Sequence, residues 1–312
     1  YAGENWNVEK NCHVIFSGQD KNTKKKVVIS TWQSIYKMPK EYFESYKVVF
    51  GDECHLFKAK SLTTLMTKLM DANIRIGTTG TLDGTHVHKL VIEGLFGRVY
   101  NVTTTKSLME RKVLSNLQID CLMLQYTDAE IQEIKRARYI DEVKWIISHP
   151  RRNEFIAKLC KNIKGNTLVL FNYVDLHGKP LHDLICNKCS NKKVFFIHGG
   201  TDANQRERIR QIVDEEKEAI LVASYGTCST GINIRNINNL IFTSPSKSVI
   251  RVLQSIGRGL RRSERKTKVK LYDIADNLSY KKYKNHTIRH LDERIKIYNK
   301  EDFEYDLVSI KI

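Results

Sequence analysis

Two adjacent carboxylates and a histidine follow a short apolar run in this 312-residue chain. The run, residues 48–50, is β-branched and aromatic and therefore predicts a buried strand. Asp52, Glu53 and His55 come after it, and open α/β sheets bind ligands outside the carboxyl ends of their strands. One acid there can hold Mg²⁺ while its neighbour takes a proton from water, which is the minimum for splitting a phosphoanhydride. The alternative is an ordinary turn that caps a helix.

A second group of residues that could take part in chemistry lies on a predicted helix over residues 248–260. Its apolar side chains recur at helical spacing: Val249, Val252, Leu253, Ile256 and Leu260. Gln254, Arg258 and Arg261 project from the opposite side, and guanidinium groups bind phosphate oxygens in bidentate fashion. Gly257 and Gly259 each cost about 1 kcal/mol inside a helix, so we expect a close backbone approach there. The alternative is a solvated basic face.

Parallel sheets must position both groups. Apolar runs that predict strands occur at residues 12–16, 27–30, 48–50, 74–77 and 99–102, and again at 168–171, 194–197, 220–223, 240–243 and 269–272. Helix-length segments separate most of them, which is the βαβ pattern of a parallel sheet. The chain is therefore predicted to be an α/β protein with two parallel-sheet domains.

Three segments follow from this pattern. Residues 1–112 form a first domain, residues 113–150 an interdomain connection, and residues 151–312 a second domain with a helical tail. The connection holds a strand candidate at 117–124 and a charged helical stretch, and it ends at Pro150, because proline favours a boundary.

Composition limits the function classes. A net charge of +17 indicates a polyanionic partner, nucleic acid first, because neutralised phosphates release counterions. A solubilising surface is the alternative, although it needs far less charge. No apolar run approaches the ~18 residues of a membrane span. The seven cysteines are scattered, which favours a reducing compartment. Cys186 and Cys189 form one Cys-x-x-Cys pair, and a zinc site there, with His182 nearby, is the minor alternative because no second pair is present.

Five strings in chain order resemble motifs Ib, II, III, V and VI of superfamily 2 helicases. They are residues 31–34, 52–55, 78–81, 222–233 and 254–261. The residues in these strings are most similar to those of the recombination and branch-migration helicases of T-even-like bacteriophages, and the resemblance extends over nearly all 312 residues. The resemblance implies two RecA-like domains, ATP and Mg²⁺ as cofactors, and a monomer in the cytoplasm of a bacterial host. It also implies branched DNA or single-strand/duplex junctions as partners, with RNA–DNA hybrids as a further option.

The same resemblance implies a role for individual residues. Asp52 would hold Mg²⁺, Glu53 would deprotonate the attacking water, and Arg258 and Arg261 would reach the γ-phosphate. Residues implied to bind the nucleotide are Asp52, His55, Gly231, Asn233, Gln254, Arg258 and Arg261. Thr79 and Thr81 would couple hydrolysis to strand movement. Residues implied to contact nucleic acid are Thr31, Trp32, Gln33, His198, Gly199, Thr201 and Ser224, although Trp32 could equally be an interior side chain.

The chain departs from the family in two ways. The phosphate-binding loop, Gly-x-x-x-x-Gly-Lys-Ser/Thr, is absent, and Gly178-Lys179 is the only Gly-Lys pair before a predicted helix. We therefore expect these residues to be part of a longer chain and to be inactive alone. Asn233 stands where many relatives carry an acid.

Two other functions remain open. One is a non-catalytic nucleic-acid-binding remnant of a helicase. The other is a metal-dependent nuclease built on Asp52, Glu53 and His55.

Overall fold

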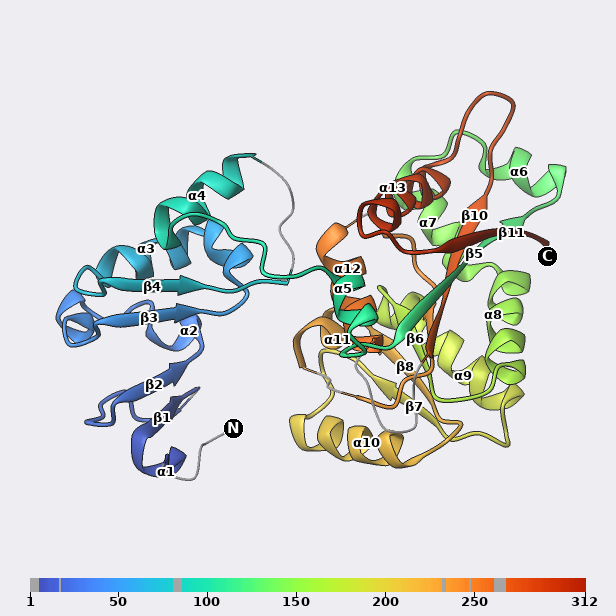
Figure 1. Cartoon of the computed structure of the whole chain (residues 1–312). Helices are drawn as coiled ribbons and strands as arrows, with labels where there is room; N and C mark the ends of the chain where they lie inside the picture. The colour runs from blue at the N-terminus through green and yellow to red at the C-terminus, as the bar shows by residue number, and fades with distance from the viewer. Residues whose placement is uncertain (1–5, 17, 81–85, 232–233, 247, 261–267) are drawn as a thin grey trace. The chain divides into compact units, whose positions relative to one another are not determined.

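The computed structural model describes residues 6–16, 18–80, 86–231, 234–246, 248–260 and 268–312. The chain divides into two compact units, Tyr1–Tyr100 and Asn101–Ile312. Figure 1 shows the helices and strands of each. Every pairing between strands is parallel, which confirms the predicted α/β fold. Among the described residues no helix has both the length and the apolar character to cross a bilayer.

The first unit contains two pairs of parallel strands. Its elements are α1 (Val8–Asn11), β1 (Cys12–Ile15), β2 (Val27–Ser30), α2 (Trp32–Ile35), η1 (Lys40–Phe43), β3 (Val48–Gly51), η2 (Cys54–Lys58), α3 (Lys60–Lys68), β4 (Ile74–Gly77) and α4 (His86–Phe96). β1 pairs with β2, and β3 pairs with β4. These strands match four of the predicted runs. The prediction that residues 48–50 are buried is wrong, because β3 pairs with β4 alone among the described strands and Val48 and Phe50 are 54% and 62% exposed. The predicted strand at 99–102 is wrong, because Tyr100 and Val102 are 77% and 93% exposed in irregular backbone.

Close packing at the ends of β3 and β4 depends on two glycines. A Cβ atom at Gly51 would lie 2.7 Å from the Phe96 ring, and one at Gly77 would lie 2.9 Å from the same ring. Phe96 in turn packs edge-to-face on Phe57, with ring centroids 5.0 Å apart. The bare backbone therefore lets α4 and η2 pack directly against the strand ends from which Asp52 and Thr78 continue.

The second unit is built on a seven-stranded parallel sheet with the order β11-β5-β10-β9-β6-β8-β7. Its strands are β5 (Asn116–Gln125), β6 (Thr167–Phe171), β7 (Val194–Ile197), β8 (Ile220–Ser224), β9 (Asn239–Phe242), β10 (Lys268–Asn277) and β11 (Tyr305–Lys311). Its helices are α5 (Thr105–Glu110), α6 (Asp128–Ile134), α7 (Tyr139–Ser148), α8 (Pro150–Asn162), η3 (Val174–Gly178), α9 (Lys179–Lys188), α10 (Ala203–Glu215), α11 (Tyr225–Gly231), α12 (Val249–Gly259) and α13 (His286–Lys300).

Residues 113–150, assigned from the sequence to a connection, supply β5 and α7 to the second unit. β5 pairs with β10 on one side and with β11 on the other. Pro150 begins α8. Proline is tolerated at the first helical position because an N–H group there would have no partner inside the helix. The C-terminal tail, expected to be helical, contains α13 and then the strand β11.

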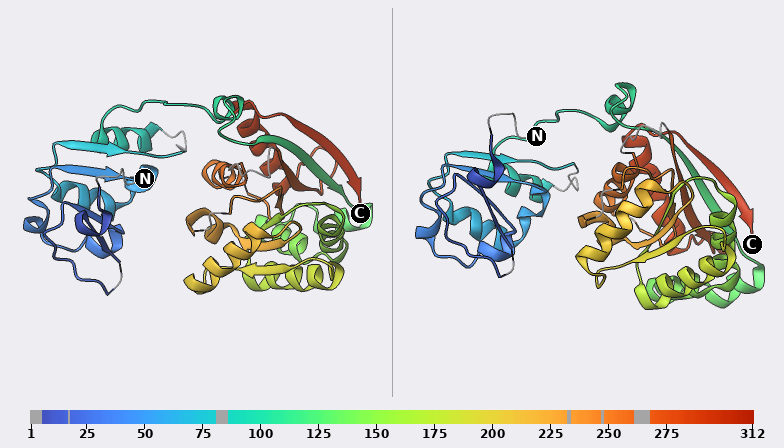
Figure 2. Two further views of the ribbon diagram at one scale, coloured as in Figure 1. Left: turned by 60° about the horizontal axis from the view of Figure 1, so that its bottom comes forward. Right: turned by 90° about the horizontal axis from the view of Figure 1, so that it is seen from below.

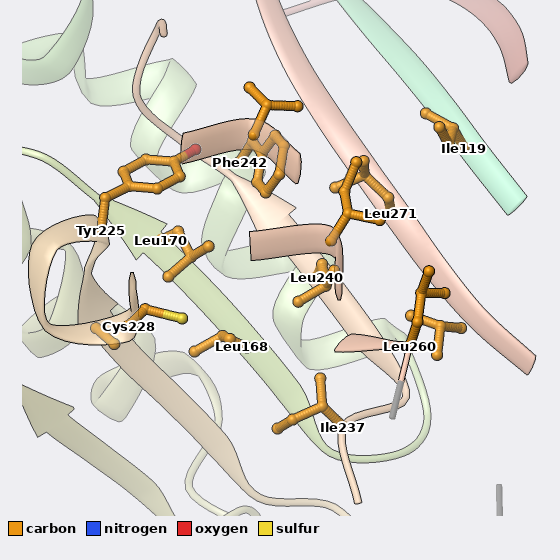
Figure 3. Packing of buried hydrophobic residues seen from close by; sticks show 14 of the residues in the cluster. Ile119, Leu168, Leu170, Tyr225, Cys228, Ile237, Leu240, Phe242, Leu260 and Leu271 are labelled. Carbon is orange, nitrogen blue, oxygen red and sulfur yellow. The ribbon is translucent and has the colours of Figure 1, made fainter. Parts of the chain in front are cut away.

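Helices cover both faces of the seven-stranded sheet (Figure 2). Leu168 and Leu170 face one layer, together with residues of α10, α12 and α13. Val169 and Phe171 face the other layer, together with residues of α7, α8 and α9. Figure 3 shows part of the first layer, in which Leu260, directly after α12, belongs to the same buried cluster as Leu240 and Leu271. Strands buried on both faces explain the continuous apolar runs in the sequence.

Two buried arginines connect these helix layers to β10. Arg152 of α8 donates to Asp276 at 2.7 and 3.1 Å and to the Thr243 carbonyl at 2.7 Å. Arg294 of α13 donates to Asp273 at 2.8 Å and to the Ser246 carbonyl at 2.8 Å. Thr243 and Ser246 belong to the segment that leads from β9 into α12. The two arginines therefore fix the entry to α12 through its backbone.

Candidate functional site

The carboxyl ends of β3 and β4 are joined by backbone hydrogen bonds. Thr78 N donates to Gly51 O at 2.9 Å, and Cys54 N donates to Thr78 O at 2.9 Å. This pairing places Thr78 beside Asp52, and its hydroxyl donates to Asp52 Oδ1 at 3.2 Å. The Glu53 N–H donates to the same oxygen at 2.9 Å. Asp52 is thus oriented through Oδ1, and neither bond uses Oδ2.

Glu53 has an unusual backbone conformation. Its φ of 49° and ψ of 46° lie in the left-handed region, which residues with a Cβ atom seldom adopt. Its Oε2 atom is shielded from solvent and accepts no hydrogen bond from the described residues, although His55 Nδ1 lies 3.2 Å away. The His55 ring can therefore orient the Glu53 carboxylate.

His55 links the two loops. Its side chain is buried, and Nδ1 lies 2.9 Å from Thr79 Oγ1 and 3.2 Å from Glu53 Oε2. The predicted base and one predicted coupling residue therefore meet at one imidazole nitrogen. Thr81, the other predicted coupling residue, lies outside the described residues.

The acid pair fits a magnesium ion held mainly by a nucleotide. Among the described residues no group of three or more His, Cys, Asp and Glu side chains could enclose a metal. Mg²⁺ in nucleotide sites, however, takes one or two protein carboxylates and completes its shell with waters and phosphate oxygens. Asp52, held by two donors to Oδ1, suits that single-ligand role.

A polar cluster also forms at strand ends of the second unit. Ser244 Oγ, after β9, accepts from Asn172 N at 3.1 Å and lies 3.3 Å from His177 Nδ1. After β8, Ser224 and Thr227 hydroxyls are 2.8 Å apart. The predicted carboxyl edge of this sheet thus collects hydroxyl, amide and imidazole groups.

His177 makes the stability of the second unit depend on pH. Burial, with a smaller effect of Arg152, lowers the pKa of His177 to about 3. Since the unfolded chain binds the proton near its usual value of about 6.5, stability is complete above that pH and falls as the pH drops. We expect a loss of about 2 kcal/mol between pH 6.5 and 5. Urea unfolding followed by Trp145 fluorescence, in a chain with Trp6→Phe and Trp32→Phe, measures it.

The variant His177→Gln is expected to flatten that pH profile by the same amount, whereas His182→Gln, a partly exposed histidine in the same unit, should leave the slope unchanged. An equally steep profile in His177→Gln would contradict the assignment.

The arginine-bearing helix is confirmed as α12. Val252, Ile256 and Leu260 are buried, and Gln254 is partly exposed, as the helical spacing predicted. A Cβ atom at Gly259 would lie 2.6 Å from Leu240, which is the predicted close approach, whereas nothing lies within 4 Å of one at Gly257. The structure describes the Arg258 backbone within α12, while Arg261 and Asn233 lie outside the described residues. Gly231 is the last residue of α11.

The predicted nucleic-acid residues lie at strand ends in each unit. Trp32 packs partly buried against the core of the first unit, 5.5 Å from the Tyr36 ring, beside the exposed Thr31 and Gln33. In the second unit Arg206 shapes the loop that contains His198. Its guanidinium donates to the Thr201 carbonyl at 2.8 Å and to the Gly199 carbonyl at 2.9 Å. Their contact with nucleic acid stays a prediction.

Gly178 and Lys179 lie where η3 runs directly into α9, and a Cβ atom at Gly178 would lie 2.5 Å from Phe171. Arg152 and Arg294 were not recognised as positioning residues. An arginine on an amphipathic helix ordinarily indicates the solvated face, so the sequence offers no signal for them.

Two family models match the chain. "Type III restriction enzyme, res subunit" covers residues 2–84, and "Helicase conserved C-terminal domain" covers residues 151–263. They identify superfamily 2 helicase domains in the chain, and its parallel α/β fold matches the RecA-like folds of such helicases.

The chain is similar to the ATP-dependent DNA helicase uvsW of Enterobacteria phage T4. The two are 33% identical over 299 residues, which is 92% of this chain and 59% of the relative. The crystal structure of T4 UvsW aligns with 31% identity and a TM-score of 0.55, over 96% of this chain and 62% of that one. The chain therefore spans about three-fifths of the length of this relative.

More distant solved structures share the fold alone. The Type ISP restriction-modification enzyme LlaBIII bound to DNA aligns over 91% of this chain and 23% of its own, with 16% identity and a TM-score of 0.61. S. cerevisiae Dbp5 bound to RNA and ADP BeF3 aligns over 97% of this chain and 71% of its own, with 11% identity and a TM-score of 0.56.

Proposed function

We propose that these residues are part of an ATP-driven DNA helicase or translocase that remodels branched DNA in recombination and fork repair, in the cytoplasm of a bacterial host. One observation carries the proposal. Glu53 presents a shielded carboxylate oxygen 3.2 Å from an imidazole nitrogen that also contacts Thr79, beside an Asp52 whose Oδ1 alone is engaged.

In this proposal Asp52 is the protein ligand of a magnesium ion that, when bound with ATP, offsets the charge of the phosphates. Glu53 orients the attacking water and accepts its proton. His55 and Thr79 transmit the change in charge at Glu53 to the loop after β4, because the His55 ring contacts both Glu53 and Thr79. Thr81 acts with Thr79 in this coupling.

The second unit supplies the groups that neutralise the transferred phosphate. Arg258 and Arg261 act as arginine fingers, and Gln254, Gly231 and Asn233 help to bind the nucleotide. The buried pairs of Arg152 with Asp276 and Arg294 with Asp273 support this role, because they fix the segment that precedes α12.

Nucleic acid is proposed to run along the loops at the strand ends. Thr31, Trp32 and Gln33 contribute from the first unit. His198, Gly199, Thr201 and Ser224 contribute from the second. The net charge of +17 supports a phosphate-rich partner, and single-strand/duplex junctions and RNA–DNA hybrids fit the same chemistry.

The test is ATP hydrolysis by the whole polypeptide from which these residues come, measured with and without single-stranded and branched DNA. We expect stimulation by DNA, and no hydrolysis by the 312 residues alone, since they contain no Gly-x-x-x-x-Gly-Lys-Ser/Thr string. A whole polypeptide that binds DNA but never hydrolyses ATP would favour the non-catalytic remnant instead.

A further inference from the structure

Residues 280–283 form a tight turn beyond the carboxyl end of β10, which Figure 1 shows standing clear of the sheet. Tyr280 and Tyr283 exchange two backbone hydrogen bonds of 2.9 Å, so that Lys281 and Lys282 occupy the tip. Both lysines are exposed, and Lys281 has a φ of 53°, in the left-handed region.

Cations surround the two tyrosine rings. The Lys281 and Lys135 ammonium groups lie 5.4 and 5.6 Å from the centroid of Tyr280, and the Arg289 guanidinium lies 5.1 Å from that of Tyr283. Both rings are partly exposed. Within the part of the chain that the structure describes, neither Lys281 nor Lys282 is paired with a carboxylate.

A cavity of about 390 Å³ adjoins the turn. It is lined by His286, Arg289, His290 and Glu293 on one face of α13. The carboxylate of Glu293 accepts a hydrogen bond of 2.7 Å from Lys296, which offsets its charge. Arg289 belongs both to this cavity and to the contact with Tyr283. The turn and the cavity are therefore one continuous surface, which holds two aromatic rings and the cations beside them.

We propose that this surface binds single-stranded nucleic acid, with a base against Tyr283 and backbone phosphates on Lys281 and Lys282. Aromatic faces interleaved with cations are how proteins hold single strands, since every base has a π-face and every nucleotide a phosphate. A lipid surface would call for aliphatic side chains at the tip instead. The inference rests on the proposed function and adds a contact outside its motif residues.

Binding of a fluorescein-labelled oligothymidylate to the 312-residue chain, measured by anisotropy at several salt concentrations, tests the inference. The double variant Lys281→Gln with Lys282→Gln should bind more weakly, and the slope of log affinity against log salt should fall by about 1.4, because each phosphate contact on a single strand contributes about 0.7. Tyr283→Leu keeps an apolar side chain but removes stacking. It should weaken binding by roughly fivefold to a hundredfold with an unchanged slope.

The matched control is Lys161→Gln with Lys164→Gln, which removes the same charge from exposed positions at the end of α8. If the 281/282 variant behaves like this control while the unsubstituted chain binds, the contact is wrong and the proposed function stands. If the unsubstituted chain binds no oligonucleotide, the proposed function fails as well. Lost binding to phosphatidylserine vesicles with unchanged oligonucleotide affinity would overturn the inference in favour of a membrane surface.

Discussion

Replacing Glu53 with glutamine is expected to lower DNA-stimulated ATP hydrolysis by the whole polypeptide about 10²- to 10⁴-fold. Glutamine has the shape of glutamate and preserves the packing against His55, but its amide cannot accept a proton from water. ATP binding should survive, because Asp52 and the arginines of the second unit are untouched. Phosphate release measures the first effect, and the affinity for a fluorescent ATP analogue measures the second.

The control for this substitution is Glu44→Gln, which makes the same chemical change at an exposed position of the same unit. It should hydrolyse ATP at the unsubstituted rate. Arg258→Ala should also abolish hydrolysis, from the other unit. Normal hydrolysis by both Glu53→Gln and Arg258→Ala would show that the motor assignment is mistaken.

Replacing Asp276 with asparagine should destabilise the second unit by about 3–5 kcal/mol, because it leaves the Arg152 guanidinium buried without its counter-charge. Arg152 is fully buried, and Asp276 also accepts from the Tyr126 hydroxyl at 2.7 Å, so no water can substitute cheaply. Urea unfolding followed by Trp145 fluorescence, in the background without Trp6 and Trp32, measures the loss.

Two further variants separate charge from packing. Asp175→Asn makes the same change in an exposed ion pair with Lys179, and it should leave the unfolding midpoint unchanged. The double variant Arg152→Met with Asp276→Leu removes both charges and should recover most of the lost stability. If the double variant is as unstable as Asp276→Asn alone, the loss arises from packing and the charge argument is wrong.

The sequence predicts the strands that carry the site, because each is a local pattern. The run at 48–50 becomes β3 and the run at 74–77 becomes β4, with Asp52 and Thr79 just beyond their ends. α12 is predicted equally well. Val252 and Ile256 of its apolar stripe are buried, and Gly259 makes the predicted close approach, to Leu240. The contact of His55 with Thr79 was beyond prediction, because it depends on how two loops meet.

Longer-range features could not be predicted for a related reason. β11 was expected to be part of a helical tail, and its place in the sheet is set by β5, far away in the chain. The run at 117–124 was recognised as a strand, but its place in the second sheet is set by β10 and β11, far away in the chain. The positioning role of Arg152 and Arg294 likewise depends on folding, which pairs them with Asp276 and Asp273.

The pairing of β5 with β11 affects how the second unit folds. Ile119 is opposite Tyr305, so the first and last strands of this unit in sequence are neighbours in space. A nascent chain leaving the ribosome therefore holds β5 with both of its edges open until β10 and β11 have been synthesised. Helices α7 to α9 can form early, but the sheet closes last, and we expect chaperones to meet this protein during that interval.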